Sequence, residues 1–206
     1  PGHGRSAGEP IASIEAMAAW LQRVLETLQL DRVALVGHSM GSLIALASAA
    51  SLGNKASHLV LIGSIAPMPV SDPILDATAN KPNNAHTMLT SFSFSKQNLL
   101  GGNPNPGMWM VSDSMRRYET EVSEALDIDM RACNAYSDGL SSAEQISCPT
   151  LMIHGDADRL TPIRATKPLM QAIPDANLAT ILGCGHSLMV EAPNEVLDYM
   201  KHHLLG

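Results

Sequence analysis

The chain has 206 residues, of which 45% are hydrophobic and 16% are charged, and its formal net charge is −7. These values are ordinary for a globular protein with one sizeable core, and the length leaves room for an inserted subdomain. Lysine and arginine form no cluster and the apolar runs are too short to cross a bilayer, so we expect no nucleic-acid partner and no membrane partner.

Strand and helix patterns alternate over residues 1–65, the first part of the predicted core. Apolar residues recur at three- and four-residue steps from Ile14 to Leu28, which predicts a helix with Ser13 as its N-cap. The elements that follow are a buried strand over 32–36, an alanine-rich helix over 42–50 and a second buried strand over 58–62.

Residues 66–147 differ in composition and are interpreted as an inserted helical cap. Prolines and Asn/Gly-rich stretches interrupt short helical patterns, among them 112–124 and 128–136. Met108 and Trp109, with the neighbouring methionines, form an apolar group that either makes the cap's own core or lines a substrate pocket. We take these two residues as candidate substrate contacts.

Residues 148–206 restore the alternation and form the second part of the core. The predicted elements are a strand over 149–154, a helix over 163–173, a strand over 177–182 and a last helix that begins near Pro193. Alternation of this kind predicts an α/β fold, with a parallel sheet that is covered by helices on both faces.

The segment from Gly37 to Gly41 is the most informative part of the sequence. It has the pattern G-x-S-x-G between a predicted strand and a predicted helix, which is typical of a nucleophile elbow. The sharp turn at Ser39 is expected to require a very small residue two positions before it and two after it. The Met40 amide would then point toward a developing oxyanion. A plain Gly/Ser turn between strand and helix is the alternative.

A serine hydroxyl becomes a nucleophile when a histidine accepts its proton, and that histidine needs a carboxylate to orient it. Asp158 and His186 each follow a predicted strand, at the edge where parallel sheets place their active sites. We therefore expect Ser39, Asp158 and His186 to converge. Cys184, two residues from His186, is the weaker alternative nucleophile, because it lies neither in an elbow nor at a helix N-terminus.

With these motifs in this order, the chain resembles the α/β-hydrolase superfamily. Four segments carry the resemblance: the elbow, the G-x-x-D-x-x-x-P pattern from Gly155 to Pro162, the histidine loop at 185–187 and the P-G-H-G loop at 1–4. The resemblance assigns the acid to Asp158 rather than Asp156. It implies strands five to eight of that fold, in the sheet order 1-2-4-3-5-6-7-8.

The same resemblance implies that the first four strands and the second oxyanion donor precede residue 1. We therefore expect this sequence to be the C-terminal two-thirds of a longer hydrolase, with an exposed apolar edge on the strand before the elbow. One missing oxyanion donor costs about a hundred- to a thousandfold in turnover, so weak or absent activity is expected for this segment alone.

The other polar candidates are interpreted as structural. We expect His38 to pack beneath the elbow, His154 to be hydrogen-bonded in the core, and Asp156 to cap N–H groups of its own turn. His3 is expected in a loop, and His202 and His203 at the exposed end of the last helix. Because no pair has metal-ligand spacing, no metal and no cofactor are predicted.

The predicted function is hydrolysis of a small or medium carboxylic ester through an acyl-enzyme. Cleavage of a C–C bond, a lactone or an amide by the same residues, and a non-catalytic binding protein, remain alternatives because one fold hosts many functions. The odd number of cysteines, Cys133, Cys148 and Cys184, favours a reducing, cytoplasmic compartment. The sequence gives no oligomeric state.

Overall fold

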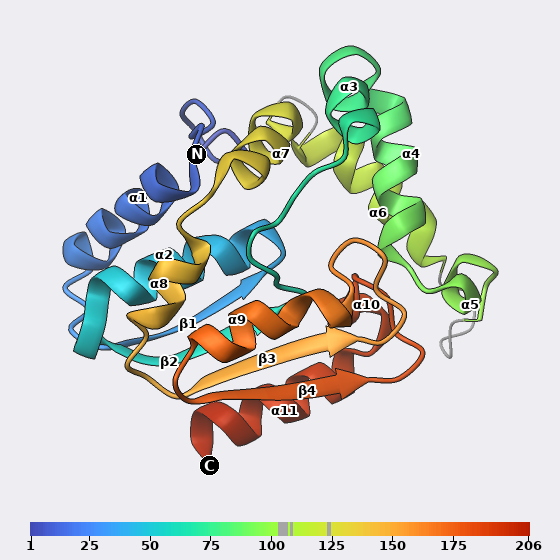
Figure 1. The fold of residues 1–206 in the computed structure, drawn as a ribbon. Coiled ribbons are helices and arrows are strands. Elements are labelled where there is room, and N and C mark those ends of the chain that lie inside the picture. Colours follow the sequence, from blue (N-terminus) through green and yellow to red (C-terminus); the bar gives the residue numbers. More distant parts are fainter. Residues whose placement is uncertain (103–106, 108, 123–124) are drawn as a thin grey trace.

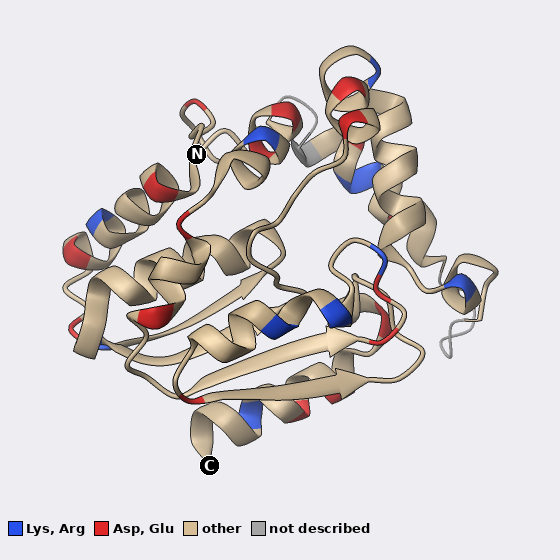
Figure 2. Cartoon of the chain, in the orientation of Figure 1, with Lys and Arg blue, Asp and Glu red and all other residues tan. Residues whose placement is uncertain are grey.

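The computed structural model describes residues 1–102, 107, 109–122 and 125–206, and its centre is one parallel sheet (Figure 1). The sheet order is β1-β2-β3-β4, in which the strands are β1 (Val33–His38), β2 (Ala56–Ile62), β3 (Thr150–Gly155) and β4 (Ala176–Ile181). These four strands contain no Asp, Glu, Lys or Arg, and the charged residues of the described part of the chain lie on helices and loops (Figure 2). The predicted α/β fold with a parallel sheet is confirmed.

Alternate residues of each strand point to opposite faces, and each face has its own hydrophobic core. Leu59 and Leu61 of β2 pack with α2 (Met40–Leu52) and α9 (Lys167–Ala172). Val60 and Ile62 pack on the other face, against α10 (Leu188–Glu191) and α11 (Pro193–Leu205). The short 3-10 helices are η1 (Gly53–Lys55) and η3 (Ile163–Thr166).

Helix α1 (Ile14–Thr27) begins at the predicted cap but buries a shorter face than predicted. The Ser13 hydroxyl accepts a hydrogen bond from the Ala16 N–H (3.2 Å), which satisfies one of the free donors of the first turn. Ile14 and Met17 are buried, whereas Leu28 lies beyond the helix and is 60% exposed. The first half of α1 therefore anchors it to the protein.

A helical insertion separates β2 from β3, as predicted. Its elements are α3 (Asp72–Asn80), α4 (Pro82–Ser93), α5 (Lys96–Leu99), α6 (Met110–Arg117), the π-helix η2 (Tyr118–Val122), α7 (Leu126–Ala135) and α8 (Gly139–Glu144). Residues of α3, α4 and α7 form a core of their own. Helix α8 instead contacts α2 and α9, and Ala143 joins the core of the sheet. The proposed boundaries at residues 66 and 147 thus enclose one helix that packs with the sheet.

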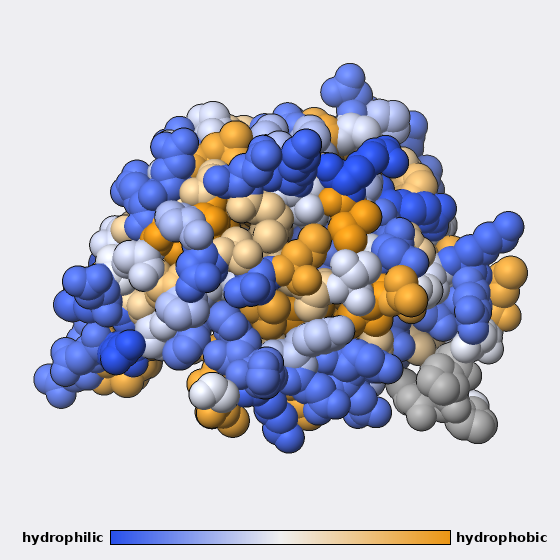
Figure 3. All heavy atoms as spheres, turned by 60° about the horizontal axis from the view of Figure 1, so that its bottom comes forward, coloured by the Kyte–Doolittle hydropathy of each residue, from blue (hydrophilic) through white to orange (hydrophobic). Residues whose placement is uncertain are grey.

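Strand β1 lies at an edge of the sheet, and one of its faces is partly exposed. Val36 is in register with Val60, which is fully buried, yet Val36 itself is 44% exposed. Helix α11 packs against β2 and β3, where Val196 joins the core that buries Val60. Figure 3, in which the bottom of the view in Figure 1 is turned forward, shows apolar side chains across the middle of the surface with hydrophilic residues around them.

Candidate active site

Ser39 occupies a strained turn between β1 and α2. Its φ of 52° and ψ of −121° lie in a region that residues with a side chain rarely adopt. The Ser39 N–H still donates to the Ile62 carbonyl (3.0 Å), so the turn stays attached to the sheet. A Cβ on residue 37 would lie 2.1 Å from the Gly41 carbonyl oxygen, which explains the glycine there. A Cβ on Gly41 would meet nothing within 4 Å, so the expected need for a small residue at 41 was wrong.

Buried hydrogen bonds hold the elbow from below. The Ser42 hydroxyl donates to the Ser39 carbonyl and is hydrogen-bonded to the Ser64 hydroxyl (2.7 Å). The Ser64 N–H donates to Nε2 of the buried His154 (3.2 Å), as expected, whereas Nδ1 of that ring has no hydrogen-bond partner among the described residues. Burial lowers the pKa of His154 to about 4, so its ring stays neutral and accepts this bond.

Met40 is the first residue of α2. The first N–H groups of a helix have no partner within the helix, and the helix dipole places partial positive charge there. The Met40 amide is therefore suited to stabilise negative charge next to Ser39. Its side chain lines the cavity described below.

Asp158 and His186 form a buried, directly hydrogen-bonded pair. Nδ1 of His186 lies 2.8 Å from Oδ2 of Asp158, which also accepts the Thr161 hydroxyl (2.7 Å). The other carboxylate oxygen accepts the N–H groups of Leu160 (2.9 Å) and Thr161 (2.8 Å). Burial alone would raise the pKa of Asp158, but the hydrogen bonds from His186 and Thr161 lower it below its usual value. The carboxylate is thus held ionised.

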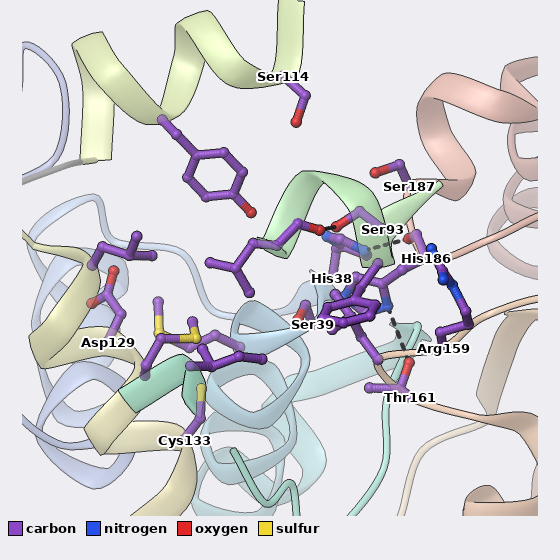
Figure 4. A pocket seen from close by; sticks show the side chains of 18 of the residues that line it. His38, Ser39, Ser93, Ser114, Asp129, Cys133, Arg159, Thr161, His186 and Ser187 are labelled. Carbon is purple, nitrogen blue, oxygen red and sulfur yellow. Dashed lines mark hydrogen bonds between the residues drawn. The ribbon is translucent and has the colours of Figure 1, made fainter. Parts of the chain in front are cut away.

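The ring of His186 lies over the end of β2, between the strands that carry Ser39 and Asp158. Gly63 follows β2, has a φ of +56° and lies next to this ring. A Cβ on residue 63 would come within 3.0 Å of the His186 ring atoms. Figure 4 shows Ser39, His186 and Thr161 on the same side of the cavity. Ser39 and His186 therefore line one cavity, and Asp158 is hydrogen-bonded to His186.

His38 lines the cavity and contacts the histidine loop, rather than packing beneath the elbow as expected. Its Nε2–H donates to the His186 carbonyl (2.9 Å), and the centroids of the two rings lie 4.6 Å apart. Burial, together with the neighbouring His186, lowers the pKa of His38 to about 4. Asp156 caps an N–H group, but that of Gly183 (2.7 Å) in the loop after β4, rather than one in its own turn.

The helical insertion fixes the histidine loop. The Ser93 carbonyl, at the end of α4, accepts the N–H groups of His186 (2.7 Å) and Ser187 (2.9 Å). The buried Glu191 accepts the Gly185 N–H (2.9 Å) on one oxygen and the Ser95 N–H (2.9 Å) on the other. Glu191 therefore connects the histidine loop to the insertion on both sides.

A cavity of about 850 Å³ lies above Ser39 and His186, within the size range of small-molecule sites. Among the described residues, five methionines line it: Met40, Met68, Met110, Met130 and Met189. Trp109 is 62% exposed and is not among the lining residues, so the structure places it outside the cavity. Met110, next in the chain, takes that place; Met108 lies outside the described residues.

Several site residues were missed by sequence reasoning. Glu191 carries a weak signal, since it lies between His186 and Pro193, at the end of the short helix α10 that follows the histidine loop. Asp129 lines the cavity and binds His3 across 126 positions of sequence, which no local pattern reveals. Among the described residues, no group of His, Cys, Asp or Glu could hold a metal ion, and no helix is long and apolar enough to span a membrane.

Comparison with known proteins agrees with this geometry. Residues 1–199 match the alpha/beta hydrolase family, and the chain belongs to that family. It is 28% identical to the pimeloyl-[acyl-carrier protein] methyl ester esterase of Aromatoleum aromaticum, over 95% of this chain and 81% of that protein. It is 26% identical to the 2-hydroxy-6-oxo-2,4-heptadienoate hydrolase of Pseudomonas putida, over 86% of this chain and 65% of that protein. It is thus similar to hydrolases of two chemical kinds.

The fold is also shared with solved structures. The enol-lactonase from Burkholderia xenovorans superimposes with a TM-score of 0.86 over all of this chain and 78% of that one, at 19% sequence identity. At that identity the likeness concerns the fold.

The two elbow glycines provide a matched pair of substitutions. Gly37→Ala is expected to destabilise the protein by about 3 kcal/mol or more, because the new methyl group meets backbone. Gly41→Ala is expected to be neutral or stabilising by up to about 1 kcal/mol, because it adds a helix-favouring residue in open space. Urea unfolding measures both, and equal destabilisation would contradict this account of the turn.

His154 gives the stability a pH dependence. Its pKa is about 4 in the folded protein against 6.5 unfolded, so below pH 6.5 the unfolded chain binds a proton that the folded protein does not. Stability should therefore fall as the pH drops from 6.5 to 4, by about 1.4 kcal/mol per pH unit from this residue. In His154→Gln this contribution should disappear, so the unfolding free energy should depend less steeply on pH between 4 and 6.5. An unfolding free energy with the same pH dependence as in the wild type would refute this role of His154.

Glu191→Ala should lower kcat for any substrate that the site hydrolyses by about tenfold or more, because the histidine loop loses its buried acceptor. KM should change much less, since Glu191 is not among the cavity-lining residues. The exposed Glu195, at the start of α11, provides the control: Glu195→Ala should leave kcat unchanged. An effect of Glu191→Ala on KM alone would show that the residue shapes binding instead.

Proposed function

We propose that the protein is a serine hydrolase of carboxylic esters in which Ser39, His186 and Asp158 form the catalytic triad. The observation that supports it most is the buried hydrogen bond between His186 and Asp158 at 2.8 Å, beside a serine in a strained turn at the floor of a cavity. The orientation of an imidazole by an ionised carboxylate is what general-base activation of a serine requires.

In the proposed reaction, His186 Nε2 takes the proton of Ser39 as Oγ attacks the ester carbonyl. The Met40 N–H stabilises the oxyanion, and His186 returns the proton to the leaving alcohol. Water then attacks the acyl-enzyme with His186 again as base, which releases the acid and restores Ser39. Asp158 keeps the imidazolium oriented throughout and is not itself protonated.

The cavity favours an uncharged, flexible substrate. Its methionines are adaptable apolar side chains, and the charged residues of its lining, Asp113, Asp129, Arg117 and Arg159, are of both signs. The relatives named above include both an ester hydrolase and a hydrolase of a 2-hydroxy-6-oxo dienoate. Cleavage of a C–C bond in a keto acid by the same triad is therefore the second candidate.

Cys133, Cys148 and Cys184 are unpaired and buried, which favours a reducing, cytoplasmic location.

A fluorophosphonate probe tests the triad without requiring turnover. We expect covalent labelling of Ser39 in the wild type, and less than about one-tenth of it in Ser39→Ala and in His186→Ala. Ser114→Ala is the control, since Ser114 lines the same cavity but lies on α6, away from His186 (Figure 4), and in no strained turn. Labelling that survives Ser39→Ala would overturn the assignment, and a folded protein without labelling would favour a binding protein.

A comparison of turnover between p-nitrophenyl esters and vinylogous diketones then separates ester hydrolysis from cleavage of a C–C bond.

A further inference from the structure

A buried carboxylate faces the cavity in a region where most of the lining is apolar. Asp129 lies on α7, is 4% exposed, and is among the residues that line the cavity. Around it the cavity wall includes Leu126, Met130 and Cys133 of the same helix. A charged group in such a place costs free energy unless its oxygens are hydrogen-bonded.

Only one of its two oxygens has a partner in the described part of the chain. Oδ2 lies 2.7 Å from Nε2 of His3, whose Nδ1 is 2.9 Å from the Pro1 carbonyl. Oδ1 is buried and has no hydrogen-bond partner among the described residues. Buried carboxylate oxygens are rarely left without a donor, so an unpartnered one at a cavity wall indicates a ligand donor.

The charge of the pair restricts the kind of ligand. Burial alone would lower the pKa of His3, but its hydrogen bonds to Asp129 and Pro1 raise it above its ordinary value. Burial raises the pKa of Asp129, and the hydrogen bond and charge of His3 oppose that rise. The carboxylate is therefore partly neutralised by His3 and suits a neutral hydrogen-bond donor, whereas a ligand carboxylate would be repelled.

Figure 4 shows Asp129 and Cys133 on the opposite side of the cavity from His186 and Arg159. A substrate whose carbonyl lies at Ser39 would extend along the methionine-lined wall toward Asp129. We propose that Oδ1 of Asp129 is a specificity determinant that accepts a hydrogen bond from a hydroxyl group on an otherwise apolar substrate chain. The inference rests on the proposed function, which makes this cavity the substrate site.

The test compares three matched esters at each of several medium chain lengths: one with a terminal hydroxyl, one with a terminal methoxy group and one with a plain alkyl end. The hydroxyl is placed on the acyl chain of p-nitrophenyl esters in one series and on the alcohol of alkyl acetates in the other. The methoxy ester keeps the polarity but cannot donate. We expect the hydroxy ester to exceed both others in kcat/KM by about tenfold or more at one chain length, because bonds to charged acceptors are the stronger ones.

Asp129→Leu should abolish this ratio between hydroxy and plain esters. Asp127→Leu removes a carboxylate from the same helix, but one that binds Arg131 and Thr78 and does not line the cavity, so the ratio should persist. A ratio within one variant does not depend on the fraction of folded protein. If neither series shows a preference for the hydroxyl in the wild type, or if the preference survives Asp129→Leu, the assignment is overturned.

Calorimetric binding of the same uncleaved esters to Ser39→Ala separates this inference from the proposed function. If the hydroxy ester binds about tenfold more tightly than the methoxy ester while the wild type shows no labelling by fluorophosphonate, the specificity site stands and the hydrolase assignment fails. If labelling occurs but binding shows no preference, Asp129 has only a structural role with His3.

Discussion

The hydrogen bond between Asp158 and His186 is the interaction on which the rest of the site depends. It joins the loop after β3 to the loop after β4, and the parallel pairing of these adjacent strands brings the two loops to one edge of the sheet. Ser39 comes from β1, two strands further along, so the His186 ring must extend over the end of β2. Gly63 provides the space for that crossing.

The insertion does more than cover the cavity. Because the Ser93 carbonyl accepts two N–H groups of the histidine loop and Glu191 accepts donors from both segments, the loop and the insertion hold each other in place. A displacement of α4 would therefore alter the position of His186 as well as the shape of the cavity. The shape of the cavity and the orientation of His186 are therefore physically linked in this fold.

The sequence was most informative where function constrains local structure. The elbow required Gly37, Ser39 and a strand–helix boundary within a few residues, and the structure has all three. Family resemblance favoured Asp158 over Asp156, and the structure shows why two nearby carboxylates differ: one contacts His186 and the other a backbone N–H of Gly183. The fold class followed from strand and helix periodicity alone.

Long-range contacts could not be predicted in this way. The pairing of His3 with Asp129 depends on how the insertion lies over the core, and helix α7 carries no pattern that distinguishes Asp129 from its neighbours. Trp109 shows the same limit, because an apolar residue beside Met110 gives no indication of which of the two faces the cavity.

The protonation state of His186 tests the central claim most directly. Nitrogen-15 NMR of the histidines, with His186 assigned by substitution, distinguishes the two neutral tautomers. We expect the proton on Nδ1, in a strong hydrogen bond to Asp158, with Nε2 free to accept the proton of Ser39, and we expect this tautomer to be lost in Asp158→Asn. A proton on Nε2 in the neutral wild-type protein, or a spectrum unaffected by Asp158→Asn, would contradict the account.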